Sequence, residues 1–264
     1  MTDFTNKIVW ITGASSGIGE ALAYAFSARG ARLILSARRV EELKRVQANC
    51  SHPELVDILP MDLSKVNEMV AKVDWVIAQK GQIDILVNNG GISQRSEAKD
   101  TDLSVYRDIM EVNFFGTIHL SNLVMKHFLE RNEGQFVIIS SITGIVGLPL
   151  RTAYTASKHA IEGFYKSLRT EIWKTNLRVL MVRPASIKTN IAKNALVGDG
   201  GTFNKADNVI DKGITPESLA ASIIKAIENN KKELLAGPKV QQFIIRMNRY
   251  FPAMVFNILK KVKP

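Results

Sequence analysis

Short apolar runs alternate with amphipathic helical stretches along almost the whole chain, and this alternation constrains the fold more than any other feature. Strand-like runs occur at residues 7–11, 32–36, 55–60, 83–87, 135–140, 178–182 and 233–235. Helical patterns separate them at residues 17–29, 40–48, 65–79, 103–131, 154–174 and 218–228, with a break expected near Asn113. Strands joined by helices in this way form parallel sheets with helices on both faces. The chain therefore predicts a Rossmann-type, doubly wound α/β fold around a mainly parallel seven-stranded sheet.

Length and composition are those of a single globular unit. A chain of 264 residues can bury one large core, and 46% hydrophobic with 23% charged residues is ordinary for a globular protein. Two segments depart from the alternation: residues 186–214 are polar and weakly patterned, and residues 239–264 carry apolar side chains at roughly helical spacing. We expect one domain over residues 1–264, with a flap at 186–214 and a basic amphipathic extension at 239–264.

The net charge of +10 is concentrated near the end of the chain. Residues 229–264 hold eight Lys or Arg and one acid, which gives +7 there and leaves +3 for the other residues. The extension could pack on the body of the protein, join a subunit interface, or make a weak contact with an anionic membrane surface. A nucleic-acid binder would also be basic, but basic clusters interleaved with stacking aromatics are missing outside the extension, which disfavours nucleic acid as a partner.

Cysteine and histidine usage disfavours a metal centre. Cys50 is the only cysteine, so neither an internal disulfide nor a cysteine cluster can form. The four histidines lack the spacing of metal ligands: His52, His119, His127 and His159. The chain starts without a basic-then-apolar leader and contains no apolar stretch near the roughly 20 residues that span a bilayer. We therefore expect no metal ion and a cytoplasmic location, at most peripheral to a membrane.

A glycine-rich turn follows the first predicted strand and opens the first predicted helix. It reads Thr12-Gly13-Ala14-Ser15-Ser16-Gly17-Ile18-Gly19. Glycines let the backbone approach a pyrophosphate, and the free N–H groups and positive dipole end of the following helix favour an anion there. Because the strand–turn–helix context is what such a motif requires, the turn predicts a dinucleotide site.

The residues after the second predicted strand indicate which dinucleotide is bound. NAD sites place an acid there to accept hydrogen bonds from the ribose hydroxyls, whereas a 2′-phosphate needs a cation. This chain has Ser36-Ala37-Arg38-Arg39 and no acid before Glu41. An arginine fork can bind two phosphate oxygens, and a positive charge at the start of a helix is otherwise unfavourable. Arg38 and Arg39 therefore favour NADP(H) as the cofactor.

Tyr154 and Lys158 form the pattern that indicates chemistry. Positions i and i+4 share one face of a helix, so the ammonium can lie beside the phenol. Ser141 precedes Tyr154 by thirteen residues. A tyrosine ordinarily has a pKa near ~10, and a nearby positive charge lowers it. We expect Lys158, together with a bound cationic cofactor ring, to lower the pKa of Tyr154 and make it an acid–base group near neutral pH.

Together these motifs resemble the short-chain dehydrogenase/reductase family, in its single-domain branch that prefers NADP. The likeness runs from Lys7 to about Leu235 and rests on motifs that agree in order and spacing. It implies that an Asp after the third strand contacts the adenine and that the turn after the fourth strand adjoins the cofactor. By this resemblance the cofactor site would include Thr12, Gly13, Ser15, Ser16, Gly17, Ile18, Gly19, Arg38, Arg39, Asp62, Leu63, Asn89, Gly90, Gly91, Tyr154, Lys158, Pro184, Ile187 and Thr189.

Two positions depart from the family's pattern. The Asn-Asn-Ala-Gly turn reads Asn-Asn-Gly-Gly here, and Gly90 in place of alanine should loosen the backbone without removing the site. After the sixth strand the usual Pro-Gly reads Pro184-Ala185, which should tighten that turn and alter its backbone path. The resemblance implies that the Ile187 backbone and the Thr189 hydroxyl hold the carboxamide of the cofactor.

The resemblance also implies a catalytic set, which is Asn113, Ser141, Tyr154 and Lys158. Tyr154 would exchange a proton with the substrate oxygen, and Ser141 would hydrogen-bond that oxygen. Lys158 would bind the nicotinamide ribose, and Asn113 would hold a water that continues the proton relay.

By resemblance, then, we expect an NADP(H)-dependent oxidoreductase that moves a hydride between nicotinamide and a carbonyl or secondary alcohol, acting as a ketoreductase. Its small-molecule substrate should be hydrophobic or amphipathic, because the candidate pocket segments are mostly apolar: residues 92–95 and 143–148, and Ile191, Leu196, Val197 and Phe203. The alternative is that the apolar side chains of the flap pack on the protein itself. The family likeness suggests a homodimer or homotetramer through residues 103–131 and 154–174. The alternatives are reduction of 3-oxoacyl groups on an acidic carrier protein, and a catalytically weak dinucleotide-binding regulator or scaffold.

Overall fold

A computed structural model describes residues 3–205 and 212–261 of the chain. Residues 206–211 of the predicted flap and residues 262–264 of the predicted extension lie outside the described residues, as do residues 1–2 of the predicted domain.

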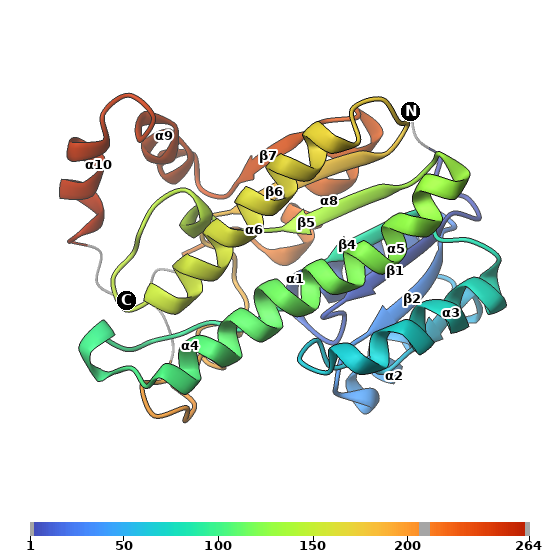
Figure 1. Ribbon diagram of the computed structural model, residues 1–264, viewed down its shortest axis with the longest axis horizontal. Helices are drawn as coiled ribbons and strands as arrows, with labels where there is room; N and C mark the ends of the chain where they lie inside the picture. Colours follow the sequence, from blue (N-terminus) through green and yellow to red (C-terminus); the bar gives the residue numbers. More distant parts are fainter. Residues whose placement is uncertain (1–2, 206–211, 262–264) are drawn as a thin grey trace.

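The described residues form one seven-stranded sheet in the order β3-β2-β1-β4-β5-β6-β7 (Figure 1). Its strands are β1 (Ile8–Thr12), β2 (Arg32–Ser36), β3 (Val56–Ile58), β4 (Ile85–Asn88), β5 (Gln135–Ile139), β6 (Arg178–Pro184) and β7 (Glu233–Ala236). Every pair of neighbouring strands is parallel, from β1 against β2 to β6 against β7. The predicted doubly wound fold is therefore confirmed, and the sheet is entirely rather than mainly parallel.

Helices cover both faces of the sheet, as the alternation of the sequence predicts. They are α1 (Gly17–Ser27), α2 (Val40–Ala48), α3 (Met69–Lys80), α4 (Leu103–Met110), α5 (Thr117–Arg131), α6 (Thr152–Glu171), α8 (Pro216–Glu228), α9 (Lys239–Met247) and α10 (Pro252–Leu259). Short 3₁₀ turns lie at Pro53–Leu55, Val66–Glu68, Ala98–Asp100 and Ile142–Gly144. Most of these boundaries differ by a few residues from the predicted ones, because the ends of periodic segments are weakly marked in a sequence.

Side chains of successive strand residues point to opposite faces, so each strand contributes to two cores. Val9 and Ile11 of β1 pack in one core with α1, α2 and α8. Ile8 and Trp10 pack in the other with α3, α5 and α6, and α5 and α6 cross in front of the sheet in Figure 1. Since both faces are buried, the strands have continuous apolar runs instead of an apolar–polar alternation.

The predicted helix over residues 103–131 is interrupted where the sequence suggested a break near Asn113. A π-helical segment, Glu111–Gly116, joins α4 to α5. An added Cβ at Gly116 would collide with the backbone carbonyl of Leu63. The π-helical segment therefore lies directly against the loop after β3, and only glycine permits this approach.

The order of the strands places a crevice at one end of the sheet. From β1 the chain runs outward through β2 to β3, then returns to β4 beside β1 and continues to β7. The loops that follow β1 and β4 therefore diverge at the carboxyl ends of two adjacent strands. In open α/β sheets this is where ligands bind.

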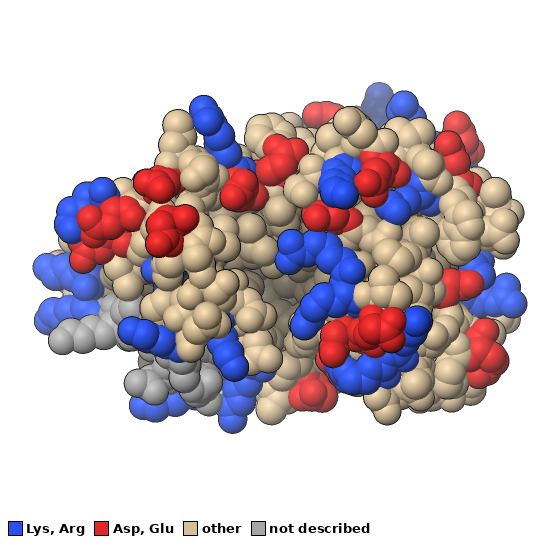
Figure 2. All heavy atoms as spheres, turned by 90° about the horizontal axis from the view of Figure 1, so that it is seen from below, with Lys and Arg blue, Asp and Glu red and all other residues tan. Residues whose placement is uncertain are grey.

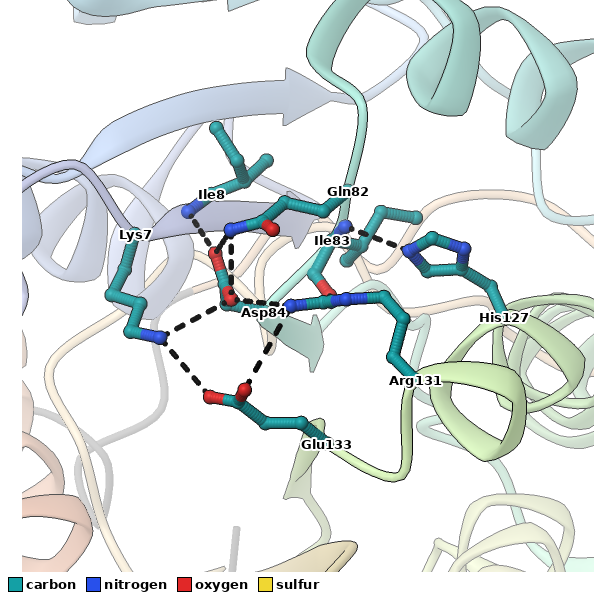
Figure 3. Close-up of polar contacts among 8 residues, drawn as sticks. All are labelled: Lys7, Ile8, Gln82, Ile83, Asp84, His127, Arg131 and Glu133. Carbon is teal, nitrogen blue, oxygen red and sulfur yellow. Dashed lines mark hydrogen bonds and ion pairs between the residues drawn. The ribbon is translucent and has the colours of Figure 1, made fainter.

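A polar cluster fastens the opposite end of the sheet (Figure 3). The buried Asp84 carboxylate, just before β4, accepts a hydrogen bond from the backbone N–H of Ile8 at 2.8 Å. It also pairs with Lys7 at 3.4 Å and with Arg131 at 3.3 Å. Glu133, just before β5, lies 3.1 Å from Lys7 and 4.0 Å from Arg131. The cluster thus ties the starts of β1, β4 and β5 to the end of α5, away from the crevice.

The predicted amphipathic extension forms α9 and α10, which lie at the left end of the molecule in Figure 1. Ile245 and Val255 bury themselves against Val146, in the loop that follows β5. No helix among the described residues is both long enough and apolar enough to cross a bilayer.

Candidate active site

A cleft of about 1390 Å³ opens at the carboxyl ends of the strands, and most of the predicted site residues line it. Figure 2 shows a hollow near the middle of the face, with basic side chains beside it. The predicted residues on its wall are Gly13, Ser15, Ser16, Gly17, Ile18, Arg38, Arg39, Asp62, Leu63, Asn89, Gly90, Gly91, Ser141, Tyr154, Lys158, Pro184, Ile187 and Thr189. Thr12, Gly19 and Asn113 lie behind this wall.

The glycine-rich turn adopts a backbone that needs glycine at two positions. Gly13 has φ +64° and Gly17 has φ +59°, in the left-handed region. An added Cβ at Gly13 would also lie 2.7 Å from Cα of Gly90. The turn after β1 therefore packs directly on the turn after β4, and together they form the floor of the cleft.

The side chains of Thr12 and Asn89 hold these two turns together. The Thr12 hydroxyl accepts the backbone N–H groups of Asn89 and Gly90, both at 3.0 Å. The Asn89 amide donates to the carbonyls of Thr12 at 3.0 Å and Gly13 at 3.1 Å. Gly19 lets α1 approach the Gly13 carbonyl, where a Cβ would clash. Thr12 and Gly19 therefore shape the site without lining the cleft, whereas Asn89 does both.

The start of α1 is suited to an anion. Ser16 is its N-cap residue, but its side chain does not cap the helix. Its hydroxyl instead accepts a hydrogen bond from Arg39 at 3.2 Å. The N–H groups of the first turn are therefore not used by this cap and face the end of the cleft where a pyrophosphate would fit.

Gly90 leaves room that an alanine would fill. A Cβ at this position would lie 2.7 Å from Cδ1 of Leu63, which lines the cleft from the loop after β3. The Leu63 side chain thus fills the space that an alanine methyl group would take at position 90, and the turn remains packed.

Two arginines follow β2 at the edge of the cleft. Arg39 donates to the Ser15 hydroxyl at 3.1 Å, so one guanidinium already contacts the glycine-rich turn. Arg38 is exposed on the same wall. Burial opposes the ionisation of Asp62, but its hydrogen bonds from Ser64 and the nearby charge of Arg38 lower its pKa overall. Arg38 and Arg39 therefore lie beside the Asp62 carboxylate at this end of the cleft. Glu20, Glu42 and Arg45 line the cleft as well, and Arg45 pairs with both acids.

Tyr154 and Ser141 meet at the inner end of the cleft. Tyr154 belongs to the first turn of α6, and Ser141 follows β5, where its hydroxyl accepts the backbone N–H of Thr143 at 3.1 Å. Burial raises the pKa of Tyr154, although its hydrogen bond with Ser141 opposes the rise. For the protein alone, desolvation of the phenol therefore dominates. The expected lowering concerns Lys158 acting together with a bound cofactor ring, and it stays a prediction.

Lys158 lies one turn further along α6 and is also buried. Its ammonium donates to the carbonyl of Ile139 at 2.9 Å and lies 5.6 Å from the centre of the Tyr154 ring. Burial lowers the pKa of Lys158 to about 8, and the charge of Glu162 counteracts part of this effect. The ammonium is therefore the main form at neutral pH and is lost in mildly alkaline solution.

Glu162 continues the same face of α6 and was missed by the sequence analysis. Its buried carboxylate receives two hydrogen bonds from Arg183 of β6, both at 2.8 Å. Arg183 in turn pairs with Glu233 of β7 at 2.7 Å. Burial disfavours the ionised carboxyl, but Arg183 outweighs this and lowers the pKa of Glu162. A permanent negative charge thus lies one helical turn beyond Lys158.

Asn113 supports the cleft from behind. Its amide oxygen accepts the backbone N–H of Ile92 at 2.8 Å, and its amide nitrogen donates to the Ile92 carbonyl at 2.9 Å and to Ser157 at 3.0 Å. The side chain is therefore committed to the loop after β4 and to α6. Its predicted water-holding role stays a prediction.

Gln94 is a second positioning residue that the sequence did not single out. It is buried in the loop after β4, and its amide oxygen accepts the backbone N–H of Ala153 at 2.7 Å. This bond fixes the first turn of α6 immediately before Tyr154. Its only sequence signal was its place in the predicted pocket segment 92–95.

The turn after β6 accommodates Ala185 through its neighbour on β7. The Ala185 N–H donates to the Ala236 carbonyl at 2.7 Å. A Cβ at Gly237 would lie 2.6 Å from the Ala185 methyl group. The absence of a side chain at Gly237 thus makes room for the methyl group of Ala185. Ile187 and Thr189 still line the cleft.

The substrate end of the cleft is partly apolar. Among the predicted pocket residues, Ile92, Ile191 and Leu196 line it, together with Asn190 and Asn194. The predicted segment 143–148 does not, because its Val146 packs against α9 and α10. Val197 and Phe203 are not on the lining either.

Comparisons with known proteins agree with this geometry. The family model described as short chain dehydrogenase matches residues 7–198. A "Dehydrogenase/reductase SDR family protein 7-like" of Anopheles gambiae is 41% identical over 97% of this chain and 82% of its own length. The human "Dehydrogenase/reductase SDR family member 7" is 38% identical over 98% of this chain and 78% of its own length.

A solved structure shows the same architecture. A short-chain dehydrogenase from Streptomyces avermitilis superposes with a TM-score of 0.83 at 27% identity, and the match covers 96% of each chain. The family model covers well over half of this chain, and the relatives span nearly all of it. The chain therefore belongs to the short-chain dehydrogenase/reductase family, whose members are oxidoreductases that bind nicotinamide cofactors.

Proposed function

We propose that this protein is an NADP(H)-dependent oxidoreductase that interconverts a carbonyl and a secondary alcohol, acting mainly as a ketoreductase on a hydrophobic small molecule. One observation carries the proposal. A single cleft joins the Ser141–Tyr154 hydrogen bond and the buried Lys158 ammonium to a glycine-rich turn and two arginines. An acid–base group, an anion site and a phosphate-binding end in one cleft are what dinucleotide-dependent carbonyl reduction requires.

The residues at the inner end have complementary tasks. A bound nicotinamide supplies or accepts the hydride. Because burial raises the pKa of Tyr154, its hydroxyl is protonated at neutral pH and can donate a proton to the carbonyl oxygen. Ser141 hydrogen-bonds the same oxygen and keeps it against the phenol. Lys158 has donors left after its bond to Ile139 for the hydroxyls of a ribose.

The outer end supports NADP(H) over NAD(H). The place where an acid would accept from ribose hydroxyls is occupied by Arg38 and Arg39, and Arg39 is already directed at the Ser15 hydroxyl. Trp10 donates to the Ser36 hydroxyl at 2.8 Å, so the last residue of β2 is committed to the core. A 2′-phosphate is the ligand that two guanidinium groups at this edge fit best.

The decisive test is NADPH consumption by the full chain against ketones of four classes: aliphatic, aromatic, steroid and acyl-thioester. We expect turnover with apolar ketones, since Ile92, Ile191 and Leu196 face the cleft. Turnover with acyl thioesters alone would favour the carrier-protein reductase. NADPH binding without turnover on any class would favour the regulator or scaffold and contradict the proposal.

Exchanging Glu162 for Gln should move the alkaline limb of the pH–rate profile for carbonyl reduction to lower pH. Burial already lowers the pKa of Lys158 to about 8, and the Glu162 charge counteracts it. Removing that charge lowers the pKa of Lys158 further, so the ammonium is lost earlier as pH rises. The measurement is kcat/KM from pH 6 to 10, a range that brackets a lysine pKa of about 8. The variant must first be shown to be folded.

The matched control is Glu171→Gln, at the exposed end of the same helix. It removes the same charge about 13 residues, or roughly 20 Å, from Lys158 and should leave the limb in place. If Glu162→Gln lowers stability but leaves the limb unchanged, Glu162 has only a structural role.

We also propose that the protein is a homodimer or homotetramer through the helices around α4, α5 and α6. Large apolar side chains are exposed there: Leu103 on α4, Phe115 and Leu129 on or beside α5, and Trp173 just after α6. Such side chains on adjacent helices support a subunit interface.

A further inference from the structure

Exposed apolar side chains are concentrated at the end of the chain. Seven of the thirteen large apolar side chains exposed in the described residues lie between positions 240 and 258. Phe243 is 62% exposed, Tyr250 73%, Phe251 57% and Phe256 64%. A soluble surface rarely leaves so many aromatic side chains together in water, so this segment has a partner.

The exposure does not come from a detached tail. Ile245 of α9 is 4% exposed and Val255 of α10 is 1% exposed, because both pack against Val146. The Gln241 amide accepts the backbone N–H of Ser186 at 3.1 Å and donates to its hydroxyl at 3.0 Å. One face of the two helices is therefore anchored, and the apolar side chains named above lie on the faces left over.

The charge of the segment identifies the kind of partner. From residue 237 to residue 261 every charged residue is basic: Lys239, Arg246, Arg249, Lys260 and Lys261. All five are exposed, and the Lys260 ammonium lies 5.7 Å from the centre of the Phe256 ring. Two copies of this surface would repel each other, since neither offers a carboxylate. Aromatic groups beside basic groups without acids match the interface of an anionic lipid bilayer.

We propose that α9 and α10 dock the protein on the surface of anionic phospholipid membranes. Phe243, Phe251 and Phe256 enter the boundary between headgroups and acyl chains, and the basic side chains bind the lipid phosphates and carboxylates. Helices of nine and eight residues are far too short to cross the bilayer and lie along it instead. The docking surface is separate from the cleft residues and does not depend on the reaction proposed above.

The test is co-sedimentation of the full chain with vesicles of phosphatidylcholine, with and without phosphatidylserine. We expect the bound fraction at low salt to be at least about tenfold larger with phosphatidylserine, and to fall as salt screens the charges. Binding that is absent, or equal on both kinds of vesicle, would overturn the proposal.

Two variants locate the contact. Phe243→Ser/Phe251→Ser/Phe256→Ser and Arg246→Gln/Arg249→Gln/Lys260→Gln change only exposed side chains and leave Ile245 and Val255 in place. Each should reduce vesicle binding about tenfold or more. The matched control, Val70→Ser/Trp75→Ser, removes exposed apolar groups on α3, away from both the extension and the proposed subunit interface, and should bind like the parent chain.

Light scattering distinguishes a membrane from a second copy of the chain. The phenylalanine variant should keep the molar mass of the parent protein in solution. A lower mass, or unchanged vesicle binding by both variants, would show that the surface is a subunit contact or has another occupant, and would overturn the proposal.

Discussion

Replacing Tyr154 with phenylalanine will lower kcat for NADPH-dependent carbonyl reduction by about 10³-fold, the range expected when a positioned general acid is removed. The substitution keeps the ring and deletes only the hydroxyl that hydrogen-bonds Ser141. The cofactor contacts of Lys158 and of the glycine-rich turn remain, so the dissociation constant of NADPH should change less than about threefold. Steady-state turnover and a fluorescence titration with NADPH measure the two effects separately.

Tyr165→Phe is the matched control. Tyr165 lies on the same helix and is also buried, but its hydroxyl contacts Ser121 at 2.6 Å and Asn88 at 3.1 Å in the core, outside the cleft. Its removal should leave kcat within about threefold, because no reacting group is touched. If Tyr154→Phe retained a tenth or more of the parent kcat, the proton would have another source and the proposed mechanism would be wrong.

Arg38→Asp will reverse the preference for the cofactor. The ratio of kcat/KM with NADPH to that with NADH should fall by about 100-fold, since a charge-assisted phosphate contact is lost and a like charge is added. The acid also creates an acceptor for the ribose hydroxyls of NADH. Initial rates with both cofactors and one ketone measure the ratio.

Arg32→Asp makes the same change of net charge at the other end of the same strand. Arg32 starts β2 and is exposed, whereas Arg38 follows the end of β2 at the cleft. The control should leave the ratio unchanged, because a general change of surface charge acts equally on both cofactors. A ratio that is unaffected by Arg38→Asp would remove the charge argument for NADP(H).

The fold and the walls of the cleft could be predicted from the sequence because their signals are local. A parallel strand buried on both faces has a continuous apolar sequence. In the turn from Thr12 to Gly19, the positions with positive φ are themselves glycines. The break near Asn113 could also be expected, since a helix of that length is uncommon. Its π-helical form could not, because it depends on how Gly116 meets the Leu63 carbonyl.

The electrostatics of the site could not be predicted, because they depend on distant residues and on burial. Helical spacing put Lys158 beside Tyr154, but it could not show that both would be buried deeply enough for desolvation to raise the pKa of Tyr154 and lower that of Lys158. The Glu162–Arg183 pair joins residues 21 positions apart on a helix and a strand. Such a contact has no local pattern, and the same is true of Gln94 and the start of α6.

The polar cluster around Asp84 separates where this protein is held together from where it reacts. The ion pairs that join β1, β4 and β5 lie at the amino ends of the strands, one sheet length away from Tyr154. Substitutions that break these ion pairs should make the protein unfold faster, but the molecules that remain folded should keep the kcat of the parent protein. Thermal stability can therefore be increased by substitutions at the amino ends of the strands without changing the active site.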